Sequence, residues 1–178
     1  MKISSSLWAG KTTIGGSEHD IWEMDGEYWK VTRPDRFGWM VLAGDDGIPE
    51  IAEATPLEYL ERWWNSNRLL GDLATLRGVS DTDDGVQIVI SQPFIEGSYP
   101  LKSRIVEEFR KYGFVLVPGF SIGSESDSSF YNDTLRLGIF DATCDNFILS
   151  QGTPIPVDVI VIPVGNRLRG QLLAMIGP

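Results

Sequence analysis

Three hydrogen-bond acceptors within an otherwise apolar stretch constrain this chain more than any other feature. The stretch GIFDATCDNFILSQGTPIPVDVIVIPVG runs from Gly138 to Gly165 and carries acceptor side chains at Asp141, Asn146 and Asp158. A strand that is buried on both faces rarely tolerates a lone carboxylate, because an unpaired charge away from water is very costly. The sequence therefore predicts either that these groups lie at strand ends facing solvent, or that a positive charge holds them.

The spacing of the three acceptors predicts that they meet. Asp141 and Asn146 have the spacing D-x-x-x-x-N, and Asp158 follows twelve residues after Asn146. A tight turn at Gln151-Gly152 separates two short strands here, and a hairpin of this length folds Asp158 back beside Asn146. Hard oxygen ligands suit Mg²⁺, so Asn146 and Asp158 are the candidate metal ligands. Asp141 can orient or deprotonate a hydroxyl group, which makes it the candidate catalytic residue.

Composition limits the classes of partner. The chain has 178 residues and a formal net charge of -10. This charge disfavours a broad nucleic-acid or anionic-membrane surface, although a metal ion could still hold an anionic ligand locally. Cys144 is the only cysteine of the sequence, which excludes an intrachain disulfide. His19 is its only histidine, which excludes a cluster of several histidines around a metal. The first residues contain no apolar run long enough for a signal peptide or a membrane span, so we expect a soluble cytoplasmic protein.

The order of the predicted elements indicates an α+β protein. Strands are expected within 12–24 and 26–34, a hairpin or loop within 37–54, and a strand within 85–93. A linker at 93–97 leads to a helix, a short strand at 114–118, a Ser/Gly-rich loop and the strands of the final hairpin. We expect a β-rich lobe over residues 1–95 and a smaller lobe over 96–178, which together form one compact unit.

Two helices are predicted from capping signals and apolar spacing. Thr55, Pro56 and Glu58 form a capping box that starts the first helix, and Gly71 ends it. The second helix is expected from Pro100 to Tyr112. The side chains expected to form the buried faces of the two helices are Leu57, Leu60, Trp64 and Leu69 in the first, and Leu101, Ile105, Phe109 and Tyr112 in the second.

The three acceptors also have the order of the protein-kinase catalytic loop: an Asp, then an Asn, then the metal-binding Asp of the next motif. Across most of its length the chain resembles the small kinase-like domains of phage and mobile-element polyvalent proteins. The motifs that carry this resemblance, in chain order, are GSEHDIW, GEYWKV, TPLEYLERWWNSNRLLGD, IVISQPFIEG, FYN, GIFDATCDN and IPVDVIVI. The resemblance implies a reduced protein-kinase-like fold, with a β-rich N-lobe and a truncated C-lobe, that binds ATP and Mg²⁺.

The same resemblance implies a nucleotide site in the first lobe. Lys30 is the counterpart of the kinase strand lysine that contacts the phosphates. Its helix partner would be Glu58 or Glu61, and the choice stays open because Glu58 also has a capping role while Glu61 lies nearer the apolar face. The remaining residues implied to contact the nucleotide are Gly15 and Gly16, in a reduced glycine-rich turn, and Gln92 and Phe94, in a hinge against the base.

Departures from the kinase pattern weaken the case for catalysis more than the case for binding. The chain has no full G-x-G-x-x-G motif, Ile139 stands where kinases usually have His, and VIVIP follows Asp158 in place of Phe-Gly. No activation segment or large helical platform is expected after this point. The leading prediction is an Mg-ATP-binding protein that could transfer a phosphoryl group to an unknown acceptor.

Two alternatives come from different classes of function. The first is a pseudokinase, an inactive kinase-like module that binds a protein partner or regulates it. The second is an acidic decoy or immunity-type interaction protein, which the net charge of -10 suggests. A decoy needs carboxylates spread over one exposed face and has no use for Lys30 or Asp158, so the surroundings of these two residues discriminate the alternatives.

Overall fold

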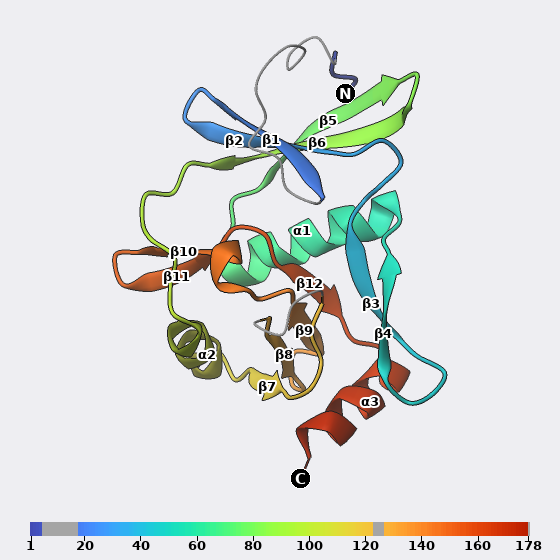
Figure 1. The fold of residues 1–178 in the computed structure, drawn as a ribbon, viewed down its shortest axis with the longest axis vertical. Coiled ribbons are helices and arrows are strands. Elements are labelled where there is room, and N and C mark those ends of the chain that lie inside the picture. Colours follow the sequence, from blue (N-terminus) through green and yellow to red (C-terminus); the bar gives the residue numbers. More distant parts are fainter. Residues whose placement is uncertain (5–17, 123–126, 178) are drawn as a thin grey trace.

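The computed structural model describes residues 1–4, 18–122 and 127–177, and it shows an α+β protein (Figure 1). The described helices are α1 (Pro56–Leu70), α2 (Lys102–Lys111), α3 (Asn166–Ile176) and the short 3₁₀ turn η2 (Cys144–Asn146). The strands are β1 (His19–Met24), β2 (Glu27–Thr32), β3 (Trp39–Ala43), β4 (Pro49–Glu53), β5 (Thr75–Thr82), β6 (Gly85–Pro93), β7 (Val115–Val117), β8 (Ser129–Asn132), β9 (Leu137–Phe140), β10 (Phe147–Ser150), β11 (Thr153–Pro156) and β12 (Ile160–Pro163).

Two four-stranded antiparallel sheets organise the molecule. The first has the strand order β1-β2-β6-β5 and the second has the order β12-β9-β8-β7. Helix α1 lies between them, with the first sheet above it and the second below, while the β3–β4 and β10–β11 hairpins flank it on either side (Figure 1). None of the described helices is long and apolar enough to span a membrane.

The central part of the second sheet, strands β9 and β12, is buried on both faces, which explains the continuous apolar sequence of these two strands. On one face Ile139 and Val161 pack with the apolar side of α2. On the other face Phe140 and Ile160 pack with α3 and with Val41 of β3. Alternate residues of each strand therefore enter different cores, and no position within these strands can hold an unpaired charge.

The register of the second sheet places the acidic residues at one of its ends. Strands β9 and β12 are antiparallel, and Phe140 at the end of β9 pairs with Ile160 at the start of β12. Asp141 directly follows β9, and Asp158 lies two residues before β12. Both carboxylates consequently lie at the same end of the sheet, outside the apolar layers.

The predicted hairpin brings Asn146 to the same place. Gln151 and Gly152 both have positive φ, 50° and 82°, as a two-residue I′ turn requires. Beyond the β10–β11 pairs, the Val157 amide donates to the Asn146 carbonyl at 2.9 Å. The turn and this closing bond fold the chain back as the sequence predicts.

Helix α1 begins and ends where its capping signals predict. The Thr55 side chain accepts a hydrogen bond from the Glu58 amide, and the Glu58 carboxylate accepts one from the Thr55 amide at 2.7 Å. Pro56 occupies the first turn, where its missing amide hydrogen costs nothing. Gly71 closes the helix at a left-handed φ of 72°, which favours glycine.

The predicted buried face of α1 is wrong at Leu57 and Trp64, whereas Leu60 and Leu69 are partly buried against the core as predicted. Leu57 and Trp64 are 65% and 62% exposed, whereas the buried side chains are Tyr59, Arg62, Trp63 and Ser66. Tyr59 and Trp63 pack on Ile88 and Ile90 of β6. The apolar pattern failed because this face carries an arginine and a serine, whose polar groups find buried partners that only the tertiary structure supplies.

The structure also differs from the sequence-based predictions in α2, α3 and β5. Ile105 and Phe109 of α2 are buried as predicted, but Leu101 and Tyr112 flank the helix and are exposed. The final strand is followed by α3, which the sequence analysis did not predict. This helix has no side-chain cap, and it is held by burial of Leu168 and Leu172 against the second sheet. Strand β5 was also missed.

The two adjacent tryptophans of α1 test the observed face directly. Trp63 is 4% exposed and Trp64 is 62% exposed. We expect Trp63→Ala to lower the free energy of unfolding by about 3–5 kcal/mol, because it leaves a cavity against β6. The matched change Trp64→Ala removes only an exposed ring that lies over Arg68 and should cost no more than about 1 kcal/mol. Urea unfolding followed by circular dichroism measures both, and equal losses would contradict the observed orientation of the helix.

Candidate functional site

A cavity of about 230 Å³ lies where the predicted acidic residues meet. Its walls come from the start of β1, from α1, from the loop between β9 and β10, and from the segment before β12. The lining residues are Glu18, His19, Ile21, Trp39, Arg62, Asp141, Asp145, Asn146, Asp158 and Ile160. Segments far apart in the sequence thus contribute charged and polar side chains to one concave site.

Asp158 is the centre of an ion-pair network. Its Oδ2 lies 3.6 Å from Lys30 Nζ and 3.6 Å from His19 Nδ1. Its Oδ1 lies 3.6 Å from Arg62 Nη2. Burial acts to raise the pKa of Asp158, but Lys30, His19 and Arg62 outweigh that effect and lower the pKa well below its usual value. The carboxylate is therefore ionised at neutral pH, and a positive environment holds it as the sequence requires.

Lys30 joins the first sheet to this network. It is 5% exposed on β2, and its Nζ donates to the Val157 carbonyl at 2.5 Å. The ammonium group also lies 5.0 Å from the centre of the Trp63 ring. Burial lowers the pKa of Lys30, and the Asp158 carboxylate opposes this shift. Lys30 does not line the cavity itself, but its ammonium group neutralises Asp158, which does.

Asp141 and Asn146 face each other across the η2 turn. The Asn146 amide nitrogen Nδ2 donates to the Asp141 carbonyl at 2.7 Å and to the Asp141 carboxylate at 3.0 Å. Asp141 has a φ of 56°, a left-handed conformation that Asp adopts more readily than most residues. Burial, followed by the charges of Asp127 and Asp158, raises the pKa of Asp141 to about 7. This carboxyl group can therefore take up or release a proton near neutral pH.

Arg62 and Glu18 form a second buried ion pair beside the network. The Arg62 guanidinium donates to both carboxylate oxygens of Glu18 through Nη1 and Nη2, the first at 3.2 Å. The guanidinium also lies 5.0 Å from the Tyr59 ring centre. Burial acts to lower the pKa of Arg62, but Glu18 and Asp158 outweigh it and raise the pKa. The arginine is permanently charged and fixed in position.

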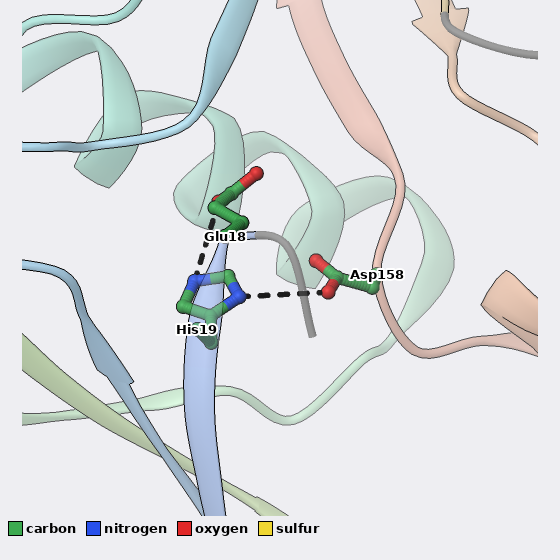
Figure 2. A group of neighbouring side chains, drawn as sticks. All are labelled: Glu18, His19 and Asp158. Carbon is green, nitrogen blue, oxygen red and sulfur yellow. Dashed lines mark ion pairs between the residues drawn. The ribbon is translucent and has the colours of Figure 1, made fainter. Parts of the chain in front are cut away.

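His19 lies between two acidic side chains of the site, Glu18 and Asp158, as Figure 2 shows. Its Nε2 lies 3.2 Å from the Glu18 carboxylate and 2.9 Å from the Tyr59 hydroxyl, while its Nδ1 faces Asp158. Ligand atoms of Glu18, His19 and Asp158 all lie within 4.8 Å of one another, close enough to hold a metal ion. However, both ring nitrogens already have partners, and Lys30 and Arg62 offset the negative charge. This arrangement favours a hydrogen-bonded ion-pair cluster over a metal site centred on His19.

The structure does not support Glu58 or Glu61 as the helix partner of Lys30. The Glu58 carboxylate is engaged in the capping box, where it accepts from the Thr55 amide and hydroxyl, each at 2.7 Å. Glu61 lies on the exposed side of α1. The carboxylate next to Lys30 is instead Asp158, and the α1 side chain that reaches the network is Arg62.

The remaining predicted nucleotide contacts lie apart from the cavity. Gln92 is buried at the end of β6 opposite Tyr28, and Phe94 is half exposed against the Tyr28 ring. Neither lines the 230 Å³ cavity. Gly15 and Gly16 lie outside the described residues.

Sequence reasoning missed Glu18, His19 and Arg62 as members of the site. His19 entered the sequence analysis only as the single histidine of the chain, and Glu18 only as part of the GSEHDIW motif. A signal for Arg62 existed: it shares the Tyr59–Trp63–Ser66 face of the helix, where a long cationic side chain between aromatic residues indicates a buried ion pair. The partners of all three lie far away in the chain, so local patterns did not identify them.

Comparisons with protein-family models, curated proteins and solved structures give no match for this chain. The kinase-like fold and function therefore stay predictions that rest on the residues and their geometry.

Asp72 gives a pH test of the charged region around α1. It is 1% exposed after the end of the helix, its Oδ2 accepts from the Ser66 hydroxyl, and burial raises its pKa to about 6. The unfolded pKa is about 3.9, so the folded protein binds more protons between pH 4 and 6 and loses stability as the pH rises through that window. We expect Asp72→Asn to remove this decline and to raise the free energy of unfolding at pH 8 by up to about 3 kcal/mol.

Urea unfolding at pH 4, 6 and 8 measures the effect. Asp83→Asn, in the exposed turn between β5 and β6, makes the same charge change and should leave the pH dependence unaltered. The same loss of stability in wild type and Asp72→Asn between pH 4 and 6 would contradict the assignment.

Proposed function

We propose that this protein is a kinase-like, Mg-ATP-binding protein whose site can transfer a phosphoryl group to a hydroxyl-bearing acceptor. The observation that carries the proposal is the meeting of Lys30, Asp141, Asn146 and Asp158 at one end of the second sheet, from three separate segments of the chain. Asp141, Asn146 and Asp158 line the same cavity, and Lys30 Nζ lies 3.6 Å from Asp158 behind its wall. A lysine on a strand, an Asp-x₄-Asn loop and a later metal-binding Asp are the parts that phosphoryl transfer uses in protein kinases.

The residues present fit a Mg²⁺ ion. Asn146 donates through Nδ2 to the carbonyl and the carboxylate of Asp141, which leaves the side-chain carbonyl oxygen Oδ1 as the atom able to bind a cation. Asp158 stays ionised because Lys30, His19 and Arg62 lower its pKa. A carboxylate and an amide oxygen in one cavity suit Mg²⁺, which usually takes only a few ligands from the protein and the rest from phosphate oxygens of the nucleotide. When bound, Mg²⁺ would neutralise charge on the phosphates.

The roles of the protein side chains follow from their positions. Lys30 would stabilise negative charge on the phosphates, because Val157 and Asp158 hold its ammonium group directly behind the cavity wall. Asp141 would accept the proton of the acceptor hydroxyl as the acceptor oxygen bonds to phosphorus and the bond between phosphorus and the ADP oxygen breaks. The hydrogen bond from Asn146 holds the Asp141 carboxylate in the cavity for this step. Catalysis on this scheme comes from positioning and electrostatics.

Thermal unfolding with and without ligand tests the proposal. A ligand that binds only the folded state stabilises it by about 2.7 kcal/mol at a hundredfold excess over its dissociation constant. Mg-ATP should therefore raise the melting temperature of the wild type. Asp158→Asn should lose most of the Mg²⁺-dependent part of that rise, and Asp141→Asn should keep it, because Asp141 is assigned to the acceptor.

The readout is the shift caused by ligand, measured against each variant's own starting temperature. This matters because Asp158→Asn also weakens the network with Lys30 and Arg62. Asp145→Asn is the matched control, since Asp145 lines the same cavity and the change in charge is identical. If no ligand shifts the melting temperature of the wild type, the nucleotide-binding proposal fails and only the functions that need no nucleotide stay. If Asp158→Asn keeps the full Mg²⁺-dependent shift, Asp158 is not the metal ligand.

A further inference from the structure

Arg62 has the features of an anion-binding group that the proposed scheme leaves unused. It lines the 230 Å³ cavity and is 2% exposed. Its Nε is buried and has no hydrogen-bond partner among the described residues. The rings of Tyr59 and Trp63 lie 5.0 and 5.6 Å from the guanidinium carbon and restrict its motion. A rigid, permanently charged donor group with an unused N–H is suited to bind a further acceptor.

Lys30 and Arg62 also converge on the same point. Lys30 Nζ and Arg62 Nη2 each lie 3.6 Å from an oxygen of Asp158. They are the only buried Lys or Arg side chains in the described part of the chain, whose net charge is strongly negative. Together these two cations balance the carboxylates of Asp158 and Glu18, so a ligand that displaces Glu18 would leave Arg62 free to bind another anion.

Glu18 occupies the face of Arg62 that a phosphate group would use. Its two carboxylate oxygens accept from Nη1 and Nη2 in a two-pronged pair. A phosphate presents the same pair of acceptors to a guanidinium, so the two groups compete for one site. Glu18 precedes the first paired residue of β1, and its carboxylate fits against Gly38, where a Cβ would lie 2.2 Å from Glu18 Cδ.

We propose that Arg62 is a second phosphate-binding residue of this site, and that the Glu18 carboxylate takes the place of a phosphate group until a polyphosphate displaces it. This inference rests on the proposed function, because it assigns the phosphate tail of the nucleotide to Arg62 together with Lys30. It also explains why α1 presents an arginine to the site where a glutamate was predicted. If Glu18 competes with phosphate for Arg62, neutralising Glu18 should tighten phosphate binding, whereas neutralising Arg62 should weaken it.

Isothermal titration calorimetry with Mg-ATP, sodium tripolyphosphate and adenosine tests this opposition. We expect Arg62→Gln to weaken Mg-ATP and tripolyphosphate binding at least tenfold, since a charge-assisted, two-pronged contact is lost. Glu18→Gln should tighten both several-fold, because the competitor is removed. Adenosine binding should not change in either variant. The double variant should behave like Arg62→Gln, because Glu18 acts only through Arg62.

Circular dichroism verifies that each variant is folded, and the double variant guards against a single variant that does not fold. Arg62→Gln leaves the Glu18 carboxylate without its main partner, so the double variant, in which the pair is neutral, carries the comparison if the single variant does not fold. Weaker binding in Glu18→Gln would overturn the inference, because Glu18 would then orient Arg62 and not compete for it. Unchanged Mg-ATP binding in the double variant would also overturn the inference and leave the proposed function standing.

The wild type separates the inference from the proposed function. If it binds neither Mg-ATP nor tripolyphosphate, both the inference and the proposed function fail. If it binds tripolyphosphate through Arg62 but does not bind Mg-ATP, only the assignment of a nucleotide fails.

Discussion

The partly buried carboxylate of Asp158 ties the two sheets and α1 to one point. A carboxylate held partly away from water is costly when it is unpaired, and close cations and hydrogen bonds offset that cost. The chain supplies Lys30 from the first sheet and Arg62 from α1. Satisfying one carboxylate therefore fixes the sheet, the helix and the end of the second sheet relative to one another. Loss of any single partner leaves the others buried with unbalanced charge, so the network acts as a unit.

The same network creates a site that can bind a ligand. Strands β9 and β12 are apolar throughout, and their pairing gathers Asp141 and Asp158 at one sheet end. The β10–β11 hairpin then returns Asn146 to them. The apolar cores on the two faces of the second sheet exclude charged side chains, which therefore lie at the end of the sheet. The cavity at that end is lined by these charged side chains. A phosphate bound there would exchange interactions with groups that already hold the two sheets together, so binding and stability are coupled.

Local physics explains which features the sequence predicted well. The ends of α1 were correct because a capping box and a left-handed Gly71 are decided by residues within one turn of the helix. The hairpin after Asn146 was correct because a two-residue turn fixes its own register. The predicted buried face of α1 was wrong at Leu57 and Trp64 for the opposite reason. Arg62 is buried there only because Glu18 and Asp158, distant in the chain, neutralise it. Helix α3 escaped detection because burial against the second sheet stabilises it, and no side-chain cap marks its start.

The mixed α+β content, the limits of α1 and the meeting of Asn146 with Asp158 could be read from the order of residues alone. These follow from backbone preferences, turn chemistry and the cost of charge inside an apolar strand. The packing of distant segments, by contrast, selects the cations that Asp158 binds and the side of α1 that faces the site, and it pairs Lys30 with Asp158 and not with Glu58 or Glu61. The physical reason is that a buried ion pair has no local signature: its free energy depends on desolvation and on the distance between charges, and both are set by how the sheets and the helix pack.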